Sequence, residues 1–229
     1  MRNAYFHGAI LPITNGIVEV GSEFEAEEVE QARLLFDATD RVLVAGGGMG
    51  WLALHIAARC PFVLIVEPLP YLYRLLVDNL HVDGVTIHVI KGAIGATRRQ
   101  ADFYVDDLWA LSRFAGEGEG ASFYTEVYDL ASLVAQAKLT GLALDVEGAE
   151  YEILLSLPAP LAPQLRRLLI EFHLFRLPPG AMDEIVGHLL SIGYRVTGRQ
   201  DHRRNPRDPQ SPDAPHVVVQ SFVWGGADA

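Results

Sequence analysis

The sequence predicts a doubly wound α/β fold, in which a mostly parallel sheet lies between two layers of helices. Short apolar runs alternate with longer helical patterns along the chain, which indicates repeated β-α units. The runs are apolar at consecutive positions, as expected of strands that helices cover on both faces. The last two runs, 194–198 and 216–223, follow each other without a helix. We therefore expect them to pair antiparallel at one edge of the sheet.

The other elements are expected in a regular order. An acidic segment with spaced apolar residues, 23–37, predicts a surface helix that leads into the first strand, 41–45. Later strands are expected at 62–67, 85–90, 141–146 and 168–173, and later helices at 50–59, 70–80, 127–138, 151–157 and 181–192. The residues after the third strand, 91–95, are expected to form a turn.

Two segments, 98–120 and 199–215, interrupt this order and are expected to lie outside the core, although 101–105 has a strand-like pattern. The chain has 229 residues, half of them hydrophobic, which is enough for one sizeable core. We expect a single domain over 1–229. It divides into an N-terminal extension and helix (1–40), a cofactor-binding and catalytic core (41–198), and a loop with the final strand (199–229).

The charge and the cysteine content narrow the range of partners. The formal net charge of −11 disfavours nucleic acid, because phosphate binding needs clustered Lys and Arg. A small-molecule partner is expected, and a homo-oligomer stays open. The single cysteine, Cys60, excludes an internal disulfide. The first ten residues show neither an export signal nor a membrane span, so a cytoplasmic protein without membrane contact is expected.

Three glycines follow the first expected strand: Gly46, Gly48 and Gly50. Glycines between a strand and a helix let a ligand approach the backbone amides, so this turn is a candidate cofactor site. The alternative is a tight turn that needs glycine only for its backbone angles. Residues 48–53 also match the dinucleotide pattern G-x-G-x-x-A, which does not separate NAD from other adenosine ligands.

An acid, Glu67, ends the second expected strand. A carboxylate at this place can accept hydrogen bonds from both hydroxyls of a ribose, and its distance from Gly46 fits the spacing of roughly 20 residues known for such acids. Glu67 is therefore a candidate cofactor ligand. The alternative is a solvated acid at the end of a strand.

Three acids follow a later buried strand: Asp145, Glu147 and Glu150. Acids this close repel one another unless a cation is near, which predicts a positively charged ligand. Glu150 alone could instead stabilise the first turn of the next helix. His173 ends the following strand at the same edge of the sheet, as a catalytic or substrate-contacting residue or as a structural one. The other histidines show no ligand spacing with acids or Cys60, so no metal site is expected.

The segment 199–215 is basic in an otherwise acidic chain. It is expected to leave the carboxyl edge of the sheet, where ligands of such folds bind. Arg203 and Arg204 are therefore candidate contacts for an acidic acceptor. The alternative is a solvated hairpin.

Several motifs together resemble the FkbM family of S-adenosylmethionine-dependent methyltransferases. The most specific of them is Asp-Val-Glu-Gly-Ala-Glu at 145–150. The other matching segments are 42–50, 66–68, 78–80 and 92–95. The resemblance implies a Rossmann-like methyltransferase fold with a seven-stranded sheet and an antiparallel C-terminal hairpin. It also implies methylation of a hydroxyl of a sugar, polyketide or similar small metabolite.

The resemblance also assigns roles to individual residues. It implies that the three glycines line the methionine and ribose parts of S-adenosylmethionine and that Glu67 holds the ribose. Ala93 and Ile94 would border the adenine, and Asp145 would lie near the methionine end and the acceptor. The candidate general bases are Asp145, Glu147 and His173, and Glu150 is a candidate substrate contact.

Two other functions stay open at this point. An NAD(P)-dependent oxidoreductase is compatible with the G-x-G-x-x-A pattern and Glu67, although the chain has no Tyr-x-x-x-Lys pair and its final strands are expected to be antiparallel. A non-catalytic protein that only binds the cofactor is the second alternative. It is motivated by Val44 and Gly48, which stand where the family motif Asp-Val-Gly-Ala-Asn-Ile-Gly has Asp and Asn.

Overall fold

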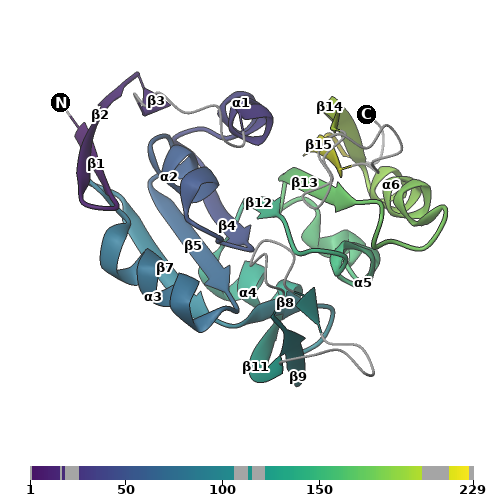
Figure 1. Cartoon of the computed structure of the whole chain (residues 1–229). Helices are drawn as coiled ribbons and strands as arrows, with labels where there is room; N and C mark the ends of the chain where they lie inside the picture. Colours follow the sequence, from purple (N-terminus) through teal and green to yellow (C-terminus); the bar gives the residue numbers. More distant parts are fainter. Residues whose placement is uncertain are drawn as a thin grey trace.

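A computed structural model describes residues 2–15, 17–18, 26–105, 113–114, 122–202 and 217–226. Its main element is a seven-stranded sheet with the order β14-β15-β13-β12-β4-β5-β7 (Figure 1). The strands are β4 (Arg41–Ala45), β5 (Phe62–Glu67), β7 (Thr86–Lys91), β12 (Gly141–Leu144), β13 (Arg167–His173), β14 (Tyr194–His202) and β15 (Val217–Trp224). β15 runs opposite to the other six strands of this sheet, which are parallel to one another. The predicted fold class is confirmed.

Helices cover both faces of this sheet. One face carries α1 (Ala26–Leu35), α2 (Trp51–Ala57) and α3 (Pro70–Asn79); the other carries α4 (Leu130–Ala137), α5 (Glu150–Leu155) and α6 (Ala181–Ser191), with a short 3-10 helix, η2 (Ala159–Leu161), after α5. In β4, Val42 and Val44 pack in the first layer, whereas Leu43 and Ala45 pack in the second. Alternate residues thus face different helices, which explains why the strand is apolar at consecutive positions. Within the described residues, no helix has the length and apolar character that a bilayer crossing requires.

Helix α1 runs from the carboxyl edge of the sheet to its amino edge. Beyond its C-terminal end, Asp37 and Asp40 pair with Arg167, the first residue of β13, and the Arg167 Nη1 to Asp37 Oδ2 distance is 2.7 Å. The Asp40 side chain is fully buried. Because ten helical residues span about 15 Å, the first turn of α1, which contains Glu28, lies toward the opposite edge, where the strands end.

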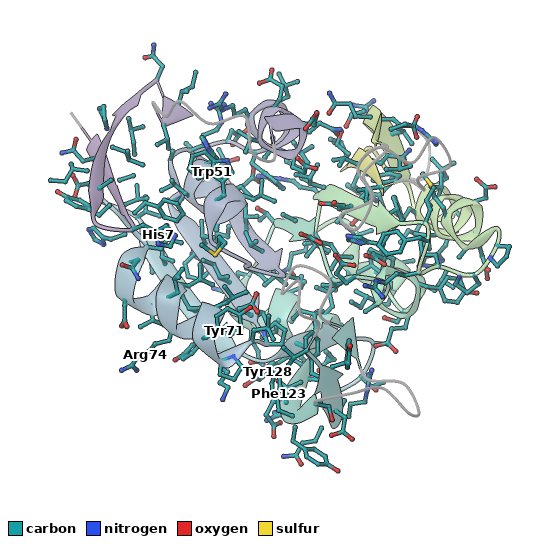
Figure 2. The ribbon with its side chains drawn as sticks, viewed as in Figure 1. His7, Trp51, Tyr71, Arg74, Phe123 and Tyr128 are labelled. Carbon is teal, nitrogen blue, oxygen red and sulfur yellow. The ribbon has the colours of Figure 1, made fainter. Side chains whose placement is uncertain are left out.

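The N-terminal extension forms a second sheet, which was not predicted. Its order is β3-β2-β1-β6, with β1 (Arg2–Phe6), β2 (Ala9–Thr14), β3 (Ile17–Val18) and β6 (His81–Val82). The turn between β1 and β2 reaches the glycine turn, since His7 Nε2 lies 3.3 Å from the carbonyl oxygen of Met49. The rings of Phe6 and Trp51 are in contact, with centroids 5.8 Å apart, and Figure 2 shows His7 and Trp51 at this junction.

A third sheet corrects three of the sequence-based expectations. Its order is β10-β9-β11-β8, with β8 (Ala93–Gly95), β9 (Arg99–Tyr104), β10 (Arg113–Phe114) and β11 (Ser122–Asp129). The expected turn at 91–95 contains a strand. The expected helix at 127–138 starts only at Leu130, because Asp129 caps it by accepting a hydrogen bond from Ser132 N at 2.7 Å. The segment 98–120 does contribute to a core, since Phe103 is 6% exposed.

The C-terminal pair is longer than expected. Strand β14 continues past 198 to His202, and its register with β15 shifts at a bulge between Val196 and Gly198. Val217 pairs with both His202 and His173. The two described ends that flank 203–216 therefore lie at the carboxyl edge of the sheet.

Candidate functional site

The order of the strands reverses between β4 and β12, and this is where the site lies. Gly46 follows β4, Asp145 follows β12, and Asp145 N donates a hydrogen bond to the carbonyl oxygen of Ala45 at 2.9 Å. In open α/β sheets, ligands bind in the crevice outside the carboxyl ends of the strands at such a switch point. The structure thus brings the glycine turn and the acidic turn side by side at one edge of the sheet.

The glycine turn needs glycine for two reasons. Gly46, Gly48 and Gly50 have φ angles of 83°, 49° and 90°, in the left-handed region that other residues avoid. A Cβ on Gly46 would lie 1.7 Å from the carbonyl oxygen of Asp145. The backbones of the two turns therefore touch, and no side chain fits between them.

Glu67 closes the glycine turn from the neighbouring strand. Its side chain is buried; Oε2 accepts a hydrogen bond from Gly48 N at 2.9 Å, and Oε1 accepts one from Leu69 N at 2.8 Å. Burial raises the pKa of Glu67 to about 7, although the backbone hydrogen bonds act in the opposite direction. Each oxygen retains a further lone pair for a ligand.

The two residues expected beside the adenine lie in different environments. Ala93 belongs to a small apolar cluster with Leu69 and Leu72, and Met49 packs against this cluster. This places Ala93 next to the loop that follows Glu67. Ile94 is 2% exposed and belongs to the main core on the α4–α6 face.

His173 lies among the three acids that follow β12. Its Nδ1 lies 2.6 Å from Glu150 Oε1, and its Nε2 lies 3.3 Å from Glu147 Oε1 and 3.5 Å from Asp145 Oδ1. The side chains of Glu150 and His173 are almost completely buried, whereas 41% of the Asp145 side chain is exposed. Glu147 adopts a left-handed backbone conformation, with φ of 52°, which is uncommon for a residue other than glycine.

The pKa values of these groups depend strongly on one another. Burial alone would lower the pKa of His173, but Glu150, Glu147 and Glu171 hold it well above its ordinary value. Burial raises the pKa of Asp145; Glu147 and Glu150 raise it further, whereas His173 lowers it. Burial also raises the pKa of Glu147, and His173 and Arg176 oppose that change. The acids around His173 therefore favour its charged form.

Four residues of the site were not predicted: Glu28, Glu171, Phe175 and Arg176. Glu171 Oε1 lies 3.8 Å from His173 Nε2, and the spacing of two residues on one strand, which puts both side chains on one face, could have indicated it. Arg176 Nε donates to Glu147 Oε2 at 2.9 Å. Glu28 lies on a helix that the sequence indicates as a surface helix, yet its side chain is 3% exposed.

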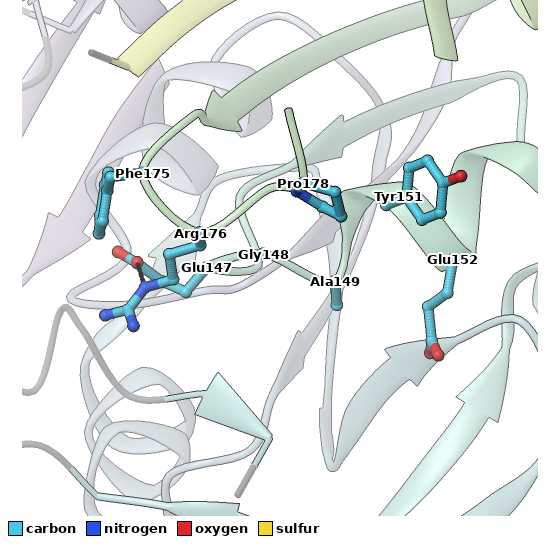
Figure 3. Close-up of a pocket in the computed structure, with 8 residues that line it drawn as sticks. All are labelled: Glu147, Gly148, Ala149, Tyr151, Glu152, Phe175, Arg176 and Pro178. Atoms are coloured by element: carbon cyan, nitrogen blue, oxygen red, sulfur yellow. Dashed lines mark hydrogen bonds and ion pairs between the residues drawn. The ribbon is translucent and has the colours of Figure 1, made fainter. Parts of the chain in front are cut away.

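A cavity of about 390 Å³ opens beside the acidic turn (Figure 3). Its lining residues are Glu147, Gly148, Ala149, Tyr151, Glu152, Phe175, Arg176 and Pro178. Glu150, expected to contact the substrate, is not among them, because it is fully buried behind His173. The other two expected substrate contacts, Arg203 and Arg204, lie outside the described residues.

Comparison with known proteins identifies the family to which the chain belongs. The sequence profile of the methyltransferase FkbM domain matches residues 51–196. No curated protein sequence matches the chain.

Solved structures share the fold at low sequence identity. The methyltransferase FkbM from Methylobacillus flagellatus KT is 14% identical with a TM-score of 0.53, over 81% of this chain and 44% of that one. The precorrin-8w decarboxylase from Methanobacterium thermoautotrophicum is 13% identical with a TM-score of 0.50, over 90% of this chain and 91% of that one. Trm5b from Pyrococcus abyssi is 10% identical with a TM-score of 0.51, over 95% of this chain and 54% of that one. The chain thus spans about half the length of two of these three structures.

Proposed function

Because the chain belongs to the FkbM methyltransferase family, we propose that it transfers a methyl group from S-adenosylmethionine to a hydroxyl oxygen of a small molecule. The observation that carries this proposal is the contact between the glycine turn after β4 and the acidic turn after β12 at the carboxyl edge of the sheet. The first turn offers backbone amides and the second offers carboxylates. A ligand that is both a nucleoside and a cation fits this combination.

The described residues fit S-adenosylmethionine in three places. Glu67 can accept hydrogen bonds from the ribose hydroxyls with the lone pairs that Gly48 N and Leu69 N leave free. Ala93 and Leu69 offer an apolar wall for the adenine. Asp145 offers a carboxylate to the ammonium and sulfonium end. When bound, the cofactor supplies an electrophilic methyl group.

The proton of the acceptor hydroxyl must leave during the reaction, and Asp145 is placed best to receive it. Of the three candidate bases, Asp145 has the most exposed side chain, at 41%, against 13% for Glu147 and 4% for His173. Arg176 holds Glu147, and Glu150 holds His173. We therefore assign proton transfer to Asp145 and positioning to the other two.

The acceptor is proposed to lie in the cavity beside the acidic turn. Aromatic and charged groups share its lining, which includes Tyr151 and Phe175 as well as Glu147 and Arg176. Such a lining suits a ring with hydroxyl groups, and both signs of charge are available to orient it. The segment that carries Arg203 and Arg204 starts and ends at the same edge, so we retain it as a proposed contact for an acidic acceptor.

Methyl transfer to a panel of hydroxylated sugars and polyketides tests the proposal. We expect S-adenosylhomocysteine to form, with a product heavier by one methyl group, only when a hydroxylated acceptor is present. Binding of S-adenosylhomocysteine without turnover on any acceptor would favour the non-catalytic alternative. Oxidation of an alcohol with NAD(P) would favour an oxidoreductase.

Glu67 should make cofactor binding depend on pH. Ionised carboxylates accept hydrogen bonds better than protonated ones, and the pKa of Glu67 is raised to about 7. The affinity for S-adenosylhomocysteine should therefore increase as the pH rises from 6 to 8, with release of a proton on binding. Glu67→Ala should weaken binding by about 1.5–3 kcal/mol, the value of hydrogen bonds to a charged group. Calorimetry in buffers of different ionisation enthalpy measures both effects, and Glu67→Gln should abolish the pH dependence.

Phe175 should contribute to acceptor binding. Its side chain is 40% exposed at the cavity, and its ring packs edge-on against the His173 ring at 5.9 Å. Phe175→Ala should raise the KM of the acceptor roughly 2- to 10-fold, as expected for the loss of 0.5–1.5 kcal/mol of ring contact. Leu190→Ala is the matched control, because Leu190 is similarly exposed, at 49%, but lies on α6 outside the cavity lining. An equal KM for both variants would remove the acceptor from this cavity.

A further inference from the structure

The two nitrogens of His173 have different surroundings. Nδ1 makes a short hydrogen bond of 2.6 Å with Glu150. Nε2 faces carboxylates of Glu147, Asp145 and Glu171 at 3.3, 3.5 and 3.8 Å. A single N–H cannot bond to three acceptors, and charge-assisted hydrogen bonds are about 2.7–2.9 Å long. The three carboxylates on the Nε2 side thus lie around a common point, each farther from Nε2 than a charge-assisted hydrogen bond.

These separations are close to the distances between ligands of one metal ion. With bonds of about 2.0–2.2 Å from the ion to each donor, neighbouring donors lie roughly 3.0–3.5 Å apart in tetrahedral or octahedral geometry. Donor atoms of Asp145, Glu171 and His173 all lie within 4.8 Å of one another. Like charges keep the carboxylates apart, so an ion between them would draw the set together.

A separate residue indicates that positive charge is missing at this place. Glu28, in the first turn of α1, is 3% exposed, and its Oε2 has no hydrogen-bond partner among the described residues. The first turn of α1 lies toward the carboxyl edge of the sheet, which also carries Asp145. A buried carboxylate oxygen without a donor is costly unless a cation compensates it. Glu28 thus adds a buried carboxylate at the edge of the sheet that carries the site.

Glu150 holds the other nitrogen of the His173 ring, Nδ1. Metal-binding histidines commonly donate their second N–H to a carboxylate, which fixes the ring and its tautomer. Glu150 is fully buried and bonds to Nδ1, so it directs Nε2 toward Asp145 and Glu171.

We propose that Asp145, Glu171 and His173 bind a divalent cation at the carboxyl edge of the sheet. The proposal differs from the sequence-based expectation of no metal site. Two carboxylates and one imidazole favour an ion that accepts oxygen ligands together with a nitrogen, and Mn²⁺ is the ion of that class to which we commit. Glu147 stands next to the ion and also lines the cavity, so an acceptor oxygen can reach the open coordination positions.

The role of the ion in the reaction rests on the proposed function. A divalent cation lowers the pKa of an oxygen that it binds and fixes its orientation. Bound to the acceptor hydroxyl, it would assist the proton transfer to Asp145. The site itself does not depend on this role.

Titration of the full chain with Mn²⁺ alone, by calorimetry and electron paramagnetic resonance, tests the site. We expect one ion per chain and a nitrogen coupling from the imidazole in pulsed spectra of the wild-type protein. Glu171→Gln should weaken Mn²⁺ binding at least 10-fold. Glu30→Gln removes the same charge from an exposed acid on α1 and should leave Mn²⁺ affinity unchanged.

Absence of stoichiometric binding, absence of the nitrogen coupling, or equal affinity in both variants would overturn the proposal. The nitrogen coupling in the wild-type spectrum tests the metal site even if Glu171→Gln does not fold. S-adenosylhomocysteine titrations distinguish this failure from failure of the proposed function. A protein that binds S-adenosylhomocysteine but not Mn²⁺ retains the proposed function and loses the metal site. A protein that binds Mn²⁺ but not S-adenosylhomocysteine retains the metal site and loses the proposed function.

Discussion

Replacing Asp145 by Asn should lower methyl transfer by about 10²- to 10⁴-fold, the usual contribution of a general base. Asn keeps the size of the side chain and the backbone bond from Asp145 N to Ala45 O, but it cannot accept the proton. Affinity for S-adenosylhomocysteine should stay nearly intact, so the loss should appear in kcat. Turnover on a working acceptor, together with calorimetry, measures both quantities.

Asp183→Asn is the control for this variant, because Asp183 is an exposed acid in the first turn of α6. It should leave turnover unchanged. Equal turnover of Asp145→Asn and wild type would show that the acceptor proton leaves by another route, and the assignment of Asp145 would be wrong.

Replacing Gly46 by Ala should destabilise the fold by roughly 2–5 kcal/mol. An L-residue in the left-handed region costs about 1–2 kcal/mol, and overpacking costs about 1–3 kcal/mol more. The new methyl group would meet the Asp145 carbonyl oxygen at 1.7 Å, so β4 and β12 must separate where the site forms. Cofactor affinity should fall with stability. Urea unfolding measures the first effect and calorimetry the second.

Gly187→Ala is the matched control, since Gly187 lies in helix α6 with an ordinary backbone angle and open space around its Cα. Its free energy of unfolding should stay equal or rise by about 0.5–1 kcal/mol, because alanine favours the helix. If Gly46→Ala unfolded at the same urea concentration as Gly187→Ala, the close contact between the two turns would not exist in solution.

The central sheet could be predicted because its strands are buried on both faces. β5 is buried along its whole length and therefore leaves a continuous apolar run from Phe62 to Val66. The family resemblance, carried mainly by residues 145–150, is confirmed by the profile match. The place of Gly46, Glu67 and Asp145 at one edge follows from the parallel order of the strands.

The other sheets could not be predicted in the same way. β11 alternates between exposed and buried residues and passes directly into α4, so the apolar residues at its end were assigned to the helix. Asp129, the N-cap, was the signal that could have separated the two. The N-terminal strands pair with one another and with β6, which has only two residues. Strands of two residues, such as β3 and β6, leave no clear period in a sequence.

The candidate site was predicted only in part, because burial of polar residues depends on tertiary contacts. Glu28 stands in an acidic helix and has the sequence pattern of a solvated residue, but β13 and β15 pack against α1. Glu150 could be placed at a helix start, yet its contact with His173 joins two elements that the sequence does not relate. The division of the chain into parts and the roles of Arg203 and Arg204 stay predictions.

Calorimetric titration of the wild-type protein with S-adenosylhomocysteine and, separately, with NADH tests the central claim most directly. We predict binding of S-adenosylhomocysteine at one site per chain, loss of about 1.5–3 kcal/mol of binding free energy in Glu67→Ala, and no binding of NADH. Binding of NADH without binding of S-adenosylhomocysteine would contradict the account.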